Sequence, residues 1–231
     1  MLYKEYKIIY EKITKDLGIQ IKDDEKASDI LDNLLQDKKL ITVDDLENLI
    51  DGKEVIVFGA GPSLESSLIF HKKELKNKIK IAADGTTTAL LKNGILPDII
   101  VTDLDGKIPD QIKANSKGSI VAIHAHGDNI DKLEKYVPKF KKNLVGTTQN
   151  NPEPYNNLHN FFGFTDGDRA ICLANYFNAK KIYIIGFDFD GKIGKYSYLT
   201  ITDKTLKLKK LKWCKYFIDI LNKEKKNINY F

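Results

Sequence analysis

The sequence has little cysteine, methionine and tryptophan, almost no arginine, and no long hydrophobic run. Its 231 residues contain two cysteines, one methionine and one tryptophan, and Arg169 is the single arginine. Cys172 and Cys214 lie in apolar, helix-like contexts, which favours buried thiols over a disulfide framework or a metal site. No run is long enough to cross a membrane. Because clustered arginines and an aromatic RNA-binding motif are also missing, we expect neither a membrane nor a nucleic-acid partner.

The chain is rich in lysine, which acidic residues largely balance. Lysine and arginine together number 37 against 32 acidic residues, for a net charge of +5. The charges are interspersed, as on a solvated surface, and the modest excess also suits an anionic substrate such as a nucleotide. Residues 1–18 carry acidic and alternating charges, unlike a signal peptide. We therefore expect a cytoplasmic enzyme.

The hydrophobic pattern changes near residue 50. Before it, apolar residues recur at helical spacing up to Gly18, and shorter helical segments follow at 29–35 and 46–50. After it, short apolar runs alternate with helix-like segments. We therefore predict a small N-terminal helical cap over residues 1–50 and one α/β catalytic domain over residues 51–231.

Six short apolar runs predict the strands of the second region. Such strands, separated by helices, indicate a mostly parallel sheet with helices on both faces, in a Rossmann-like α/β fold. Right-handed crossovers bring the carboxyl ends of the strands to one edge, where open α/β sheets bind ligands. A lysine-rich helix is predicted near the end of the chain, at 206–221. The predicted strands are 54–58, 79–83, 98–102, 119–123, 143–146 and 181–186.

Carboxylates follow two neighbouring strands of the predicted sheet. Asp84 comes after the second apolar run, and Asp103 and Asp105 come after the third. Three carboxylates at one edge form a hard oxygen site suited to Mg²⁺ bound together with substrate phosphates. This pattern predicts phosphoryl or nucleotidyl transfer. Each acid alone has a simpler interpretation, because Asp84 could cap the next helix and the Asp-x-Asp pair could form a turn.

A glycine-rich turn, Gly-Ala-Gly-Pro-Ser-Leu at 59–64, follows the first core strand. Glycine lets the backbone approach a ligand closely, and free N–H groups at a helix start can bind phosphate. A tight strand-to-helix turn would use the same residues. The segment is not a Walker A loop, because no Gly-Lys-Ser/Thr follows. The residues that we expect at the nucleotide from this turn and the next are Gly59, Gly61, Pro62, Ser63, Asp84 and Gly85.

The segment His-Ala-His-Gly-Asp at 124–128 ends the fourth strand. A zinc site is conceivable, but His-x-His with one aspartate is an incomplete ligand set. We favour Asp128 as a further Mg²⁺ ligand or water holder, with His124 and His126 near phosphate or substrate. The predicted metal ligands are Asp84, Asp103, Asp105 and Asp128.

Arg169 lies in the segment 165–170, before an apolar helix. Its planar guanidinium binds phosphate in a bidentate way that lysine does not reproduce, so we predict a phosphate clamp. An ion pair with a neighbouring acid is the alternative, and Asp166 or Asp168 could also cap the helix. A second Asp-x-Asp pair, within 186–191, is either a further site element or a turn.

Together these motifs resemble the archaeal 6-hydroxymethyl-7,8-dihydropterin pyrophosphokinases, a family related to thiamin pyrophosphokinases. The resemblance implies Mg²⁺-dependent transfer of diphosphate from ATP to the hydroxymethyl group of a reduced pterin. AMP leaves, and the product enters methanopterin or folate-type cofactor biosynthesis. Relatives also suggest a homodimer. The resemblance covers about 55–189 and depends on 59–64, 83–87, the pair Asp103 and Asp105, 124–128, and 163–170.

The resemblance also implies roles for these residues. The acids would hold Mg²⁺ against the phosphates, Arg169 would bind phosphate oxygens, and His124 or His126 would orient or deprotonate the attacking alcohol. The residues expected to carry catalysis are Asp103, Asp105, His126 and Arg169. Those expected at the pterin are Thr148, Gln149, Asp166 and Asp168.

Three alternatives remain open at the level of the sequence. The turn at 59–64 also occurs in a related group that includes transferases of CMP-activated sugars, although this does not explain the segment 97–105. Thiamin could be the acceptor, but Thr86, Thr102 and Gly106 depart from the thiamin pyrophosphokinase signatures. A binding module without turnover is the third alternative.

Overall fold

The computed structural model describes residues 1–197 and 204–231. Within them a nine-stranded sheet runs in the order β1-β6-β5-β4-β3-β2-β8-β9, with β7 also paired to β6. Each pair is parallel, which confirms the predicted α/β fold. The strands are β1 (Lys39–Leu40), β2 (Glu54–Phe58), β3 (Ile79–Ala83), β4 (Ile99–Thr102), β5 (Ile120–Ala125), β6 (Lys142–Thr148), β7 (Leu158–His159), β8 (Lys181–Ile185) and β9 (Ile228–Tyr230).

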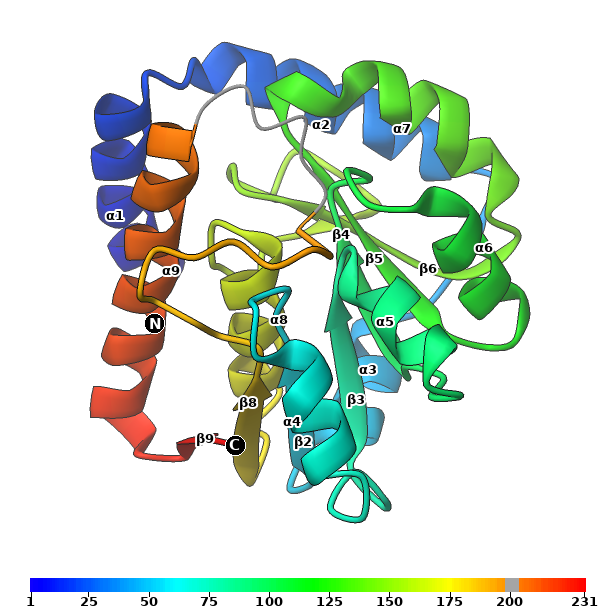
Figure 1. Ribbon diagram of the computed structural model, residues 1–231. Helices are drawn as coiled ribbons and strands as arrows, with labels where there is room; N and C mark the ends of the chain where they lie inside the picture. Colours follow the sequence, from blue (N-terminus) through cyan, green and yellow to red (C-terminus); the bar gives the residue numbers. More distant parts are fainter. Residues whose placement is uncertain (198–203) are drawn as a thin grey trace.

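Helices cover both faces of the sheet (Figure 1). Side chains alternate along each strand. In β2, Val55 and Val57 enter the core under α1, α3, α8 and α9, whereas Ile56 and Phe58 enter the core under the other helices. The helices are α1 (Tyr3–Leu17), α2 (Ile21–Leu35), α3 (Val43–Ile50), α4 (Leu64–Phe70), α5 (Thr86–Lys92), α6 (Ile108–Ser116), α7 (Ile130–Tyr136), α8 (Asp166–Tyr176) and α9 (Lys204–Lys225), with 3-10 turns η1 (Gly127–Asn129) and η2 (Val137–Lys139).

The six predicted strands are β2, β3, β4, β5, β6 and β8. The predicted helix near the end of the chain is α9, and both cysteines are buried free thiols, as expected. The sequence did not indicate β1, β7 or β9, because two or three residues are too few to show a period. Helix α2 begins well before its predicted start at residue 29, and Asp23 and Asp24 lie in its first turn, where acids are favourable.

The N-terminal helices are built into the same cores as the rest of the chain. Tyr6 and Ile13 of α1 pack in one core with α8 and α9, and Leu31 of α2 packs in the other. Figure 1 shows α1 beside α9, and α2 beside α7. Within the described residues, the predicted boundary after residue 50 therefore marks no separate hydrophobic core.

The order of the strands contains a topological switch point. From β2 the chain adds β3, β4, β5 and β6 outward on one side, and then returns to place β8 on the other side of β2. Segments 59–63 and 186–190 follow the two strands that flank this point. Such a crevice outside the carboxyl ends of the strands is where doubly wound sheets bind ligands.

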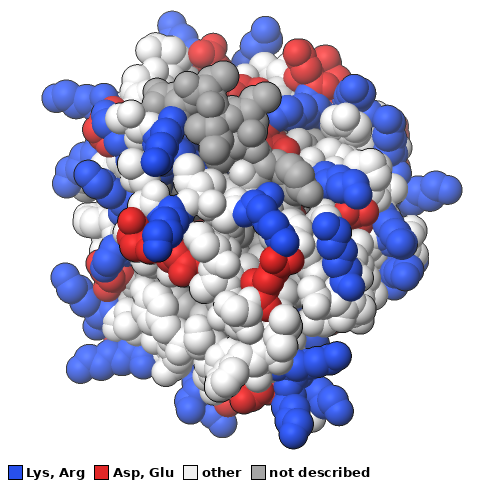
Figure 2. All heavy atoms as spheres, viewed as in Figure 1, with Lys and Arg blue, Asp and Glu red and all other residues white. Residues whose placement is uncertain are grey.

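The surface charge follows the composition. Figure 2 shows lysine side chains spread over the visible face and interleaved with acidic ones, as on an ordinary solvated surface. Among the helices of the described residues, none is both long and apolar enough to span a bilayer.

Candidate active site

A cavity of about 540 Å³ opens at the carboxyl edge of the sheet. Its walls come from the segments after β2, β3, β4, β5 and β8, from the starts of α2 and α8, and from one side of α9. Predicted site residues therefore meet in one place, as expected for the ends of parallel strands. Those that line the cavity are Gly59, Gly61, Asp84, Gly85, Asp103, Asp105, His126, Asp128, Gln149, Asp166 and Arg169.

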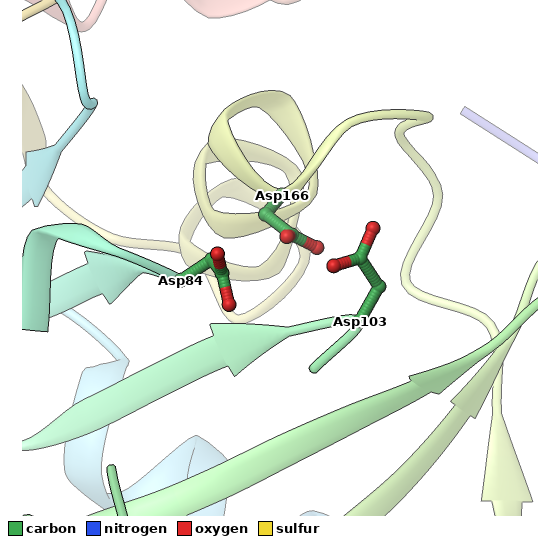
Figure 3. A group of neighbouring side chains, drawn as sticks. All are labelled: Asp84, Asp103 and Asp166. Carbon is green, nitrogen blue, oxygen red and sulfur yellow. The ribbon is translucent and has the colours of Figure 1, made fainter. Parts of the chain in front are cut away.

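Three carboxylates lie together in this cavity. Asp84 follows β3, Asp103 follows β4 and Asp166 is the first residue of α8. One oxygen from each lies within 4.8 Å of the others, and Figure 3 shows the three side chains turned toward one another. Three hard oxygen donors with space beside them fit Mg²⁺, which usually keeps water and phosphate ligands as well. We call this group the carboxylate triad.

The membership of the triad differs from the predicted ligand set. Asp166, predicted at the pterin, replaces Asp105 and Asp128. Leu104, between Asp103 and Asp105, is buried and has a φ of 66°. On one side of this turn Asp103 faces the triad. On the other side Asp105 is exposed and accepts a hydrogen bond from Lys132. Asp128 is also exposed. Both acids line the cavity outside the triad.

Asp84 is held by the end of β4, the loop after it and α6. Its Oδ1 accepts hydrogen bonds from Thr102 Oγ1 at 2.7 Å, Gly106 N at 3.0 Å and Gln111 Nε2 at 2.8 Å. A Cβ at Gly106 would lie 2.6 Å from Asp84 Oδ2, so glycine is needed there. The cap of α5 is Gly85, without a side-chain hydrogen bond. The side chain of Asp84 therefore faces the triad, and the helix-cap interpretation is wrong.

Asp103 is held by the segment after β5. His126 Nε2 lies 3.3 Å from its Oδ2, and Asn129 Nδ2 donates to its backbone carbonyl at 2.9 Å. The other ring nitrogen of His126 accepts from the Asp128 N–H at 3.4 Å. His124 is buried, with Nδ1 against Thr147 Oγ1, and burial, followed by the nearby charge of Arg169, lowers its pKa. Of the two predicted histidines, His126 is therefore the one at the cavity.

Burial and mutual repulsion shape the charges of the triad. Burial, with the Asp103 charge as a smaller cause, raises the pKa of Asp84 to about 6. The same two causes raise the pKa of Asp166 well above its usual range. Burial alone would also raise the pKa of Asp103, but the hydrogen bond and charge of His126 and the charge of Arg169 lower it below its usual range. A cation would relieve this repulsion, so the donor set fits a divalent metal.

Arg169 lies at the inner wall of the cavity and is 7% exposed. Its Nη1 lies 3.2 Å from Asp166 Oδ1, and its Nη2 donates to Gln149 Oε1 at 3.1 Å. The ion pair considered as an alternative to a phosphate clamp is therefore present, and its acid belongs to the triad. Arg169 thus joins the triad to the end of β6.

A buried aspartate missed by the sequence analysis supports this arrangement. Asp24 of α2 is 2% exposed. Its Oδ2 accepts from Gln149 Nε2 at 2.7 Å and from the hydroxyl of Tyr10, and its Oδ1 accepts from Gly127 N at 2.7 Å. Because Asp24 stands among charged, exposed neighbours in a helical turn, its sequence context carries no signal of this role.

The turn after β2 is bonded within the protein. The N–H groups of Gly59, Gly61 and Ser63 donate to Ile185 O, Gly186 O and Asp188 Oδ2 at 2.8, 2.8 and 3.0 Å. A Cβ at Gly61 would lie 2.2 Å from Asp188 Oδ2. These N–H groups are therefore not free for a phosphate, and Pro62 has none. The glycines allow close packing against the segment after β8, as the tight-turn interpretation predicted.

Two residues predicted at the pterin have other partners. Asp168 is 0% exposed and caps α8, accepting from Phe164 N at 2.5 Å and Thr165 N at 2.9 Å. Thr148 is buried with its hydroxyl 2.7 Å from Ser28 Oγ. Neither lines the cavity, whereas Gln149 and Asp166 do.

This is an α/β protein with a parallel sheet, and at the carboxyl edge of that sheet lies a carboxylate cluster suited to a divalent metal and phosphate groups. The family model described as 6-hydroxymethylpterin diphosphokinase MptE-like matches residues 28–194. The chain belongs to this family. The resemblance inferred from the motifs is thereby confirmed.

Three relatives have the same name, 6-hydroxymethyl-7,8-dihydropterin pyrophosphokinase. The protein of Methanocaldococcus jannaschii is 44% identical over 239 residues, covering 98% of this chain and 98% of its own. That of Pyrococcus furiosus is 44% identical and covers 96% and 94%. That of Methanothermobacter thermautotrophicus is 45% identical and covers 81% and 79%.

Among solved structures, the MAf glycosyltransferase from Magnetospirillum magneticum AMB-1 is similar with a TM-score of 0.43 and 17% sequence identity. The match covers 77% of this chain and 29% of that chain. A likeness at this level supports no inference about the fold or the function.

Proposed function

We propose that the protein is a 6-hydroxymethyl-7,8-dihydropterin pyrophosphokinase that uses ATP and Mg²⁺. The hydroxymethyl oxygen forms a bond to the β-phosphorus of ATP. The bond from that phosphorus to the oxygen bridging to the α-phosphate breaks, AMP leaves with the bridging oxygen, and the alcohol proton passes to water. The family and the names of the three relatives support the reaction.

The carboxylate triad is the observation that carries the proposal for this site. Asp84, Asp103 and Asp166 would hold Mg²⁺, and the bound ion would neutralise the charge that develops on the phosphates. Positioning and charge neutralisation supply most of the catalysis in such a transfer. The predicted ligands Asp105 and Asp128 lie farther out in the same cavity, and we do not include them in the inner set.

We assign His126 a positioning role. Both of its ring nitrogens have partners, since Nε2 faces Asp103 and Nδ1 accepts from the Asp128 N–H. With a partner at each nitrogen, the ring has no free lone pair to act as a base toward the cavity. His126 instead fixes the oxygens of Asp103, and Arg169 fixes Asp166 in the same way. With its charge at the wall of the cavity, Arg169 also attracts phosphate.

The test is an assay with ATP, Mg²⁺ and reduced 6-hydroxymethylpterin, in which AMP and pterin diphosphate are measured by mass spectrometry. We expect the two products in equal amounts. Asp103→Asn should lower the rate by about 100-fold or more, because one inner oxygen ligand and its charge are lost. Asp131→Asn, an exposed change on α7, is the matched control.

Three outcomes would contradict the proposal. If AMP forms with thiamin but not with the pterin, the acceptor is wrong. If AMP forms with neither acceptor while the protein is folded, the reaction itself is wrong. An Asp103→Asn variant with full activity would refute the triad as the metal site.

A further inference from the structure

The cavity extends well beyond the carboxylate triad. The triad lies at the ends of β3 and β4, whereas the switch point lies between β2 and β8. Since neighbouring strands are about 4.8 Å apart, the end of β8 lies about 10 Å from the end of β3. Both regions line the same cavity. A bicyclic ring with a hydroxymethyl arm would bridge the two regions.

Asp188 lies in the switch-point region. Ser63 donates to its Oδ2 twice, from N at 3.0 Å and from Oγ at 2.8 Å. Gly61 provides the space, because a Cβ there would meet the same oxygen. Asp188 lines the cavity, and among the hydrogen bonds of residues 1–197 and 204–231 none reaches its Oδ1. The Asp188 carboxylate is thus held through Oδ2, and its Oδ1 is left to accept hydrogen bonds from a ligand.

Apolar side chains line the cavity that contains Asp188. They include Phe187, Ile193 and Leu211, and Lys192 and Lys210 line it as well. A Cβ at Gly59 would lie 3.0 Å from the ring of Phe187, so the aromatic ring packs closely on the turn after β2. Apolar and aromatic side chains together with a fixed polar group are typical of sites for flat heterocycles.

The other carboxylates of the cavity do not have this setting. Asp24 is bonded at both oxygens. Asp23, Asp105 and Asp128 are exposed, and the triad would hold the metal. Within the described part of the chain, Asp188 is therefore the cavity carboxylate that is half-buried, fixed by the backbone and outside the metal site.

A pterin ring presents a ring N–H and an exocyclic amino group side by side, which are two donors that a carboxylate accepts together. The edge of adenine alternates acceptors with its amino donor, so it matches a carboxylate less well. We propose that Asp188 recognises the donor edge of the pterin and thereby sets the specificity for the acceptor. This inference rests on the proposed function. It also places the acceptor ring at the switch point, with the hydroxymethyl group toward the triad.

The test compares Asp188→Asn with Asp190→Asn. The first change keeps an oxygen for Ser63 and turns an amino group toward the pterin donors. The second removes the charge of an exposed neighbour that is paired with Lys192. For Asp188→Asn we expect the KM for the pterin to rise by about 10- to 100-fold, with the KM for ATP changed less than about threefold. Asp190→Asn should leave both KM values unchanged.

A second measurement does not depend on turnover. The Kd of 6-hydroxymethylpterin, followed by its own fluorescence without ATP, should weaken in Asp188→Asn by the same factor as the KM. If that variant does not fold, Ser63→Ala removes one of the two bonds that fix the carboxylate and should raise the pterin KM by a smaller factor. An unchanged pterin KM and Kd, or a rise confined to the KM for ATP, would overturn the inference while leaving the reaction intact. Absence of AMP formation by the unaltered protein would instead refute the proposed function.

Discussion

At the scale of single residues, the site depends on side chains held in unfavourable positions. Burial and the charge of Asp103 oppose ionisation of Asp84 and raise its pKa. The backbone of Asp84 also lies in the left-handed region, with a φ of 42°. Leu104 has a φ of 66° although its side chain is buried. Positions of this kind cost stability and persist where the surrounding structure fixes them. Here they bring Asp84 and Asp103 together, which is the arrangement that a metal needs.

The first prediction concerns Asp84→Asn in metal-free protein. The pKa of Asp84 rises from 3.8 to about 6 on folding, so the folded protein keeps a proton that the unfolded chain releases. The stability of the unaltered protein therefore falls as the pH rises from about 4 to about 6. The asparagine variant does not lose this stability, because its side chain has no proton to release in that range. Its free energy of unfolding should exceed that of the unaltered protein by up to about 3 kcal/mol at pH 7, and by little below pH 4.

Urea unfolding in the presence of a chelator, at pH values between 4 and 7.5, measures this difference. Asp131→Asn, which keeps Asp84, should match the unaltered protein at each pH. Two results would show that folding does not raise the pKa of Asp84. One is an Asp84→Asn variant that is less stable than the unaltered protein at pH 7. The other is a difference in stability that does not change with pH.

At the scale of elements, α2 and α8 join the site to the rest of the fold. Helix α8 supplies Asp166 and Arg169, and α2 supplies Asp24, which fixes Gln149 and through it Arg169. Tyr10 of α1 donates to the same aspartate. The first two helices therefore help to hold the side chains of the candidate site in position.

The second prediction is that Asp24→Asn lowers kcat by about tenfold and the free energy of unfolding by about 1–3 kcal/mol. The new amino group would face a donor in either orientation, Gln149 Nε2 and the Tyr10 hydroxyl in one and the Gly127 N–H in the other. Rotation of the Gln149 amide does not solve this conflict, because its amino group would then face Arg169. Glu25→Gln, the exposed neighbour on α2, is the control for both measurements.

A purely structural role for Asp24 would give a different result. In that case the unfolding free energy would fall, but kcat would remain unchanged at a temperature where the variant is folded. Loss of kcat with an unchanged KM for the pterin is the expected pattern, since both oxygens of Asp24 are bonded within the protein and it acts on the site through Gln149 and Arg169.

At the scale of the whole molecule, the sequence predicted the sheet better than the site. Continuous apolar runs such as 54–58 are readable because they are buried on both faces. Asp84 and Asp103 were readable because they end adjacent strands. Asp166 was not placed with them, since α8 returns to the triad after a long separation in the chain. Asp105 lies outside the triad because the left-handed turn at Leu104 separates it from Asp103.

The turn at 59–63 shows the same limit. Its glycines are typical both of phosphate loops and of tight packing, and only the partners of its N–H groups distinguish the two. Those partners come from the segment after β8, far along the chain. Local pattern therefore identified where the site lies, whereas long-range contacts determine which side chains face it.

The most direct test of the metal site is the Mg²⁺ dependence of AMP formation in Asp166→Asn, compared with Asp128→Asn. The structure predicts that Asp166→Asn raises the Mg²⁺ concentration for half-maximal rate by about tenfold or more, because an inner ligand is lost. Asp128→Asn, outside the triad, should shift it far less. A large shift for Asp128→Asn with little change for Asp166→Asn would contradict the carboxylate triad as the metal site.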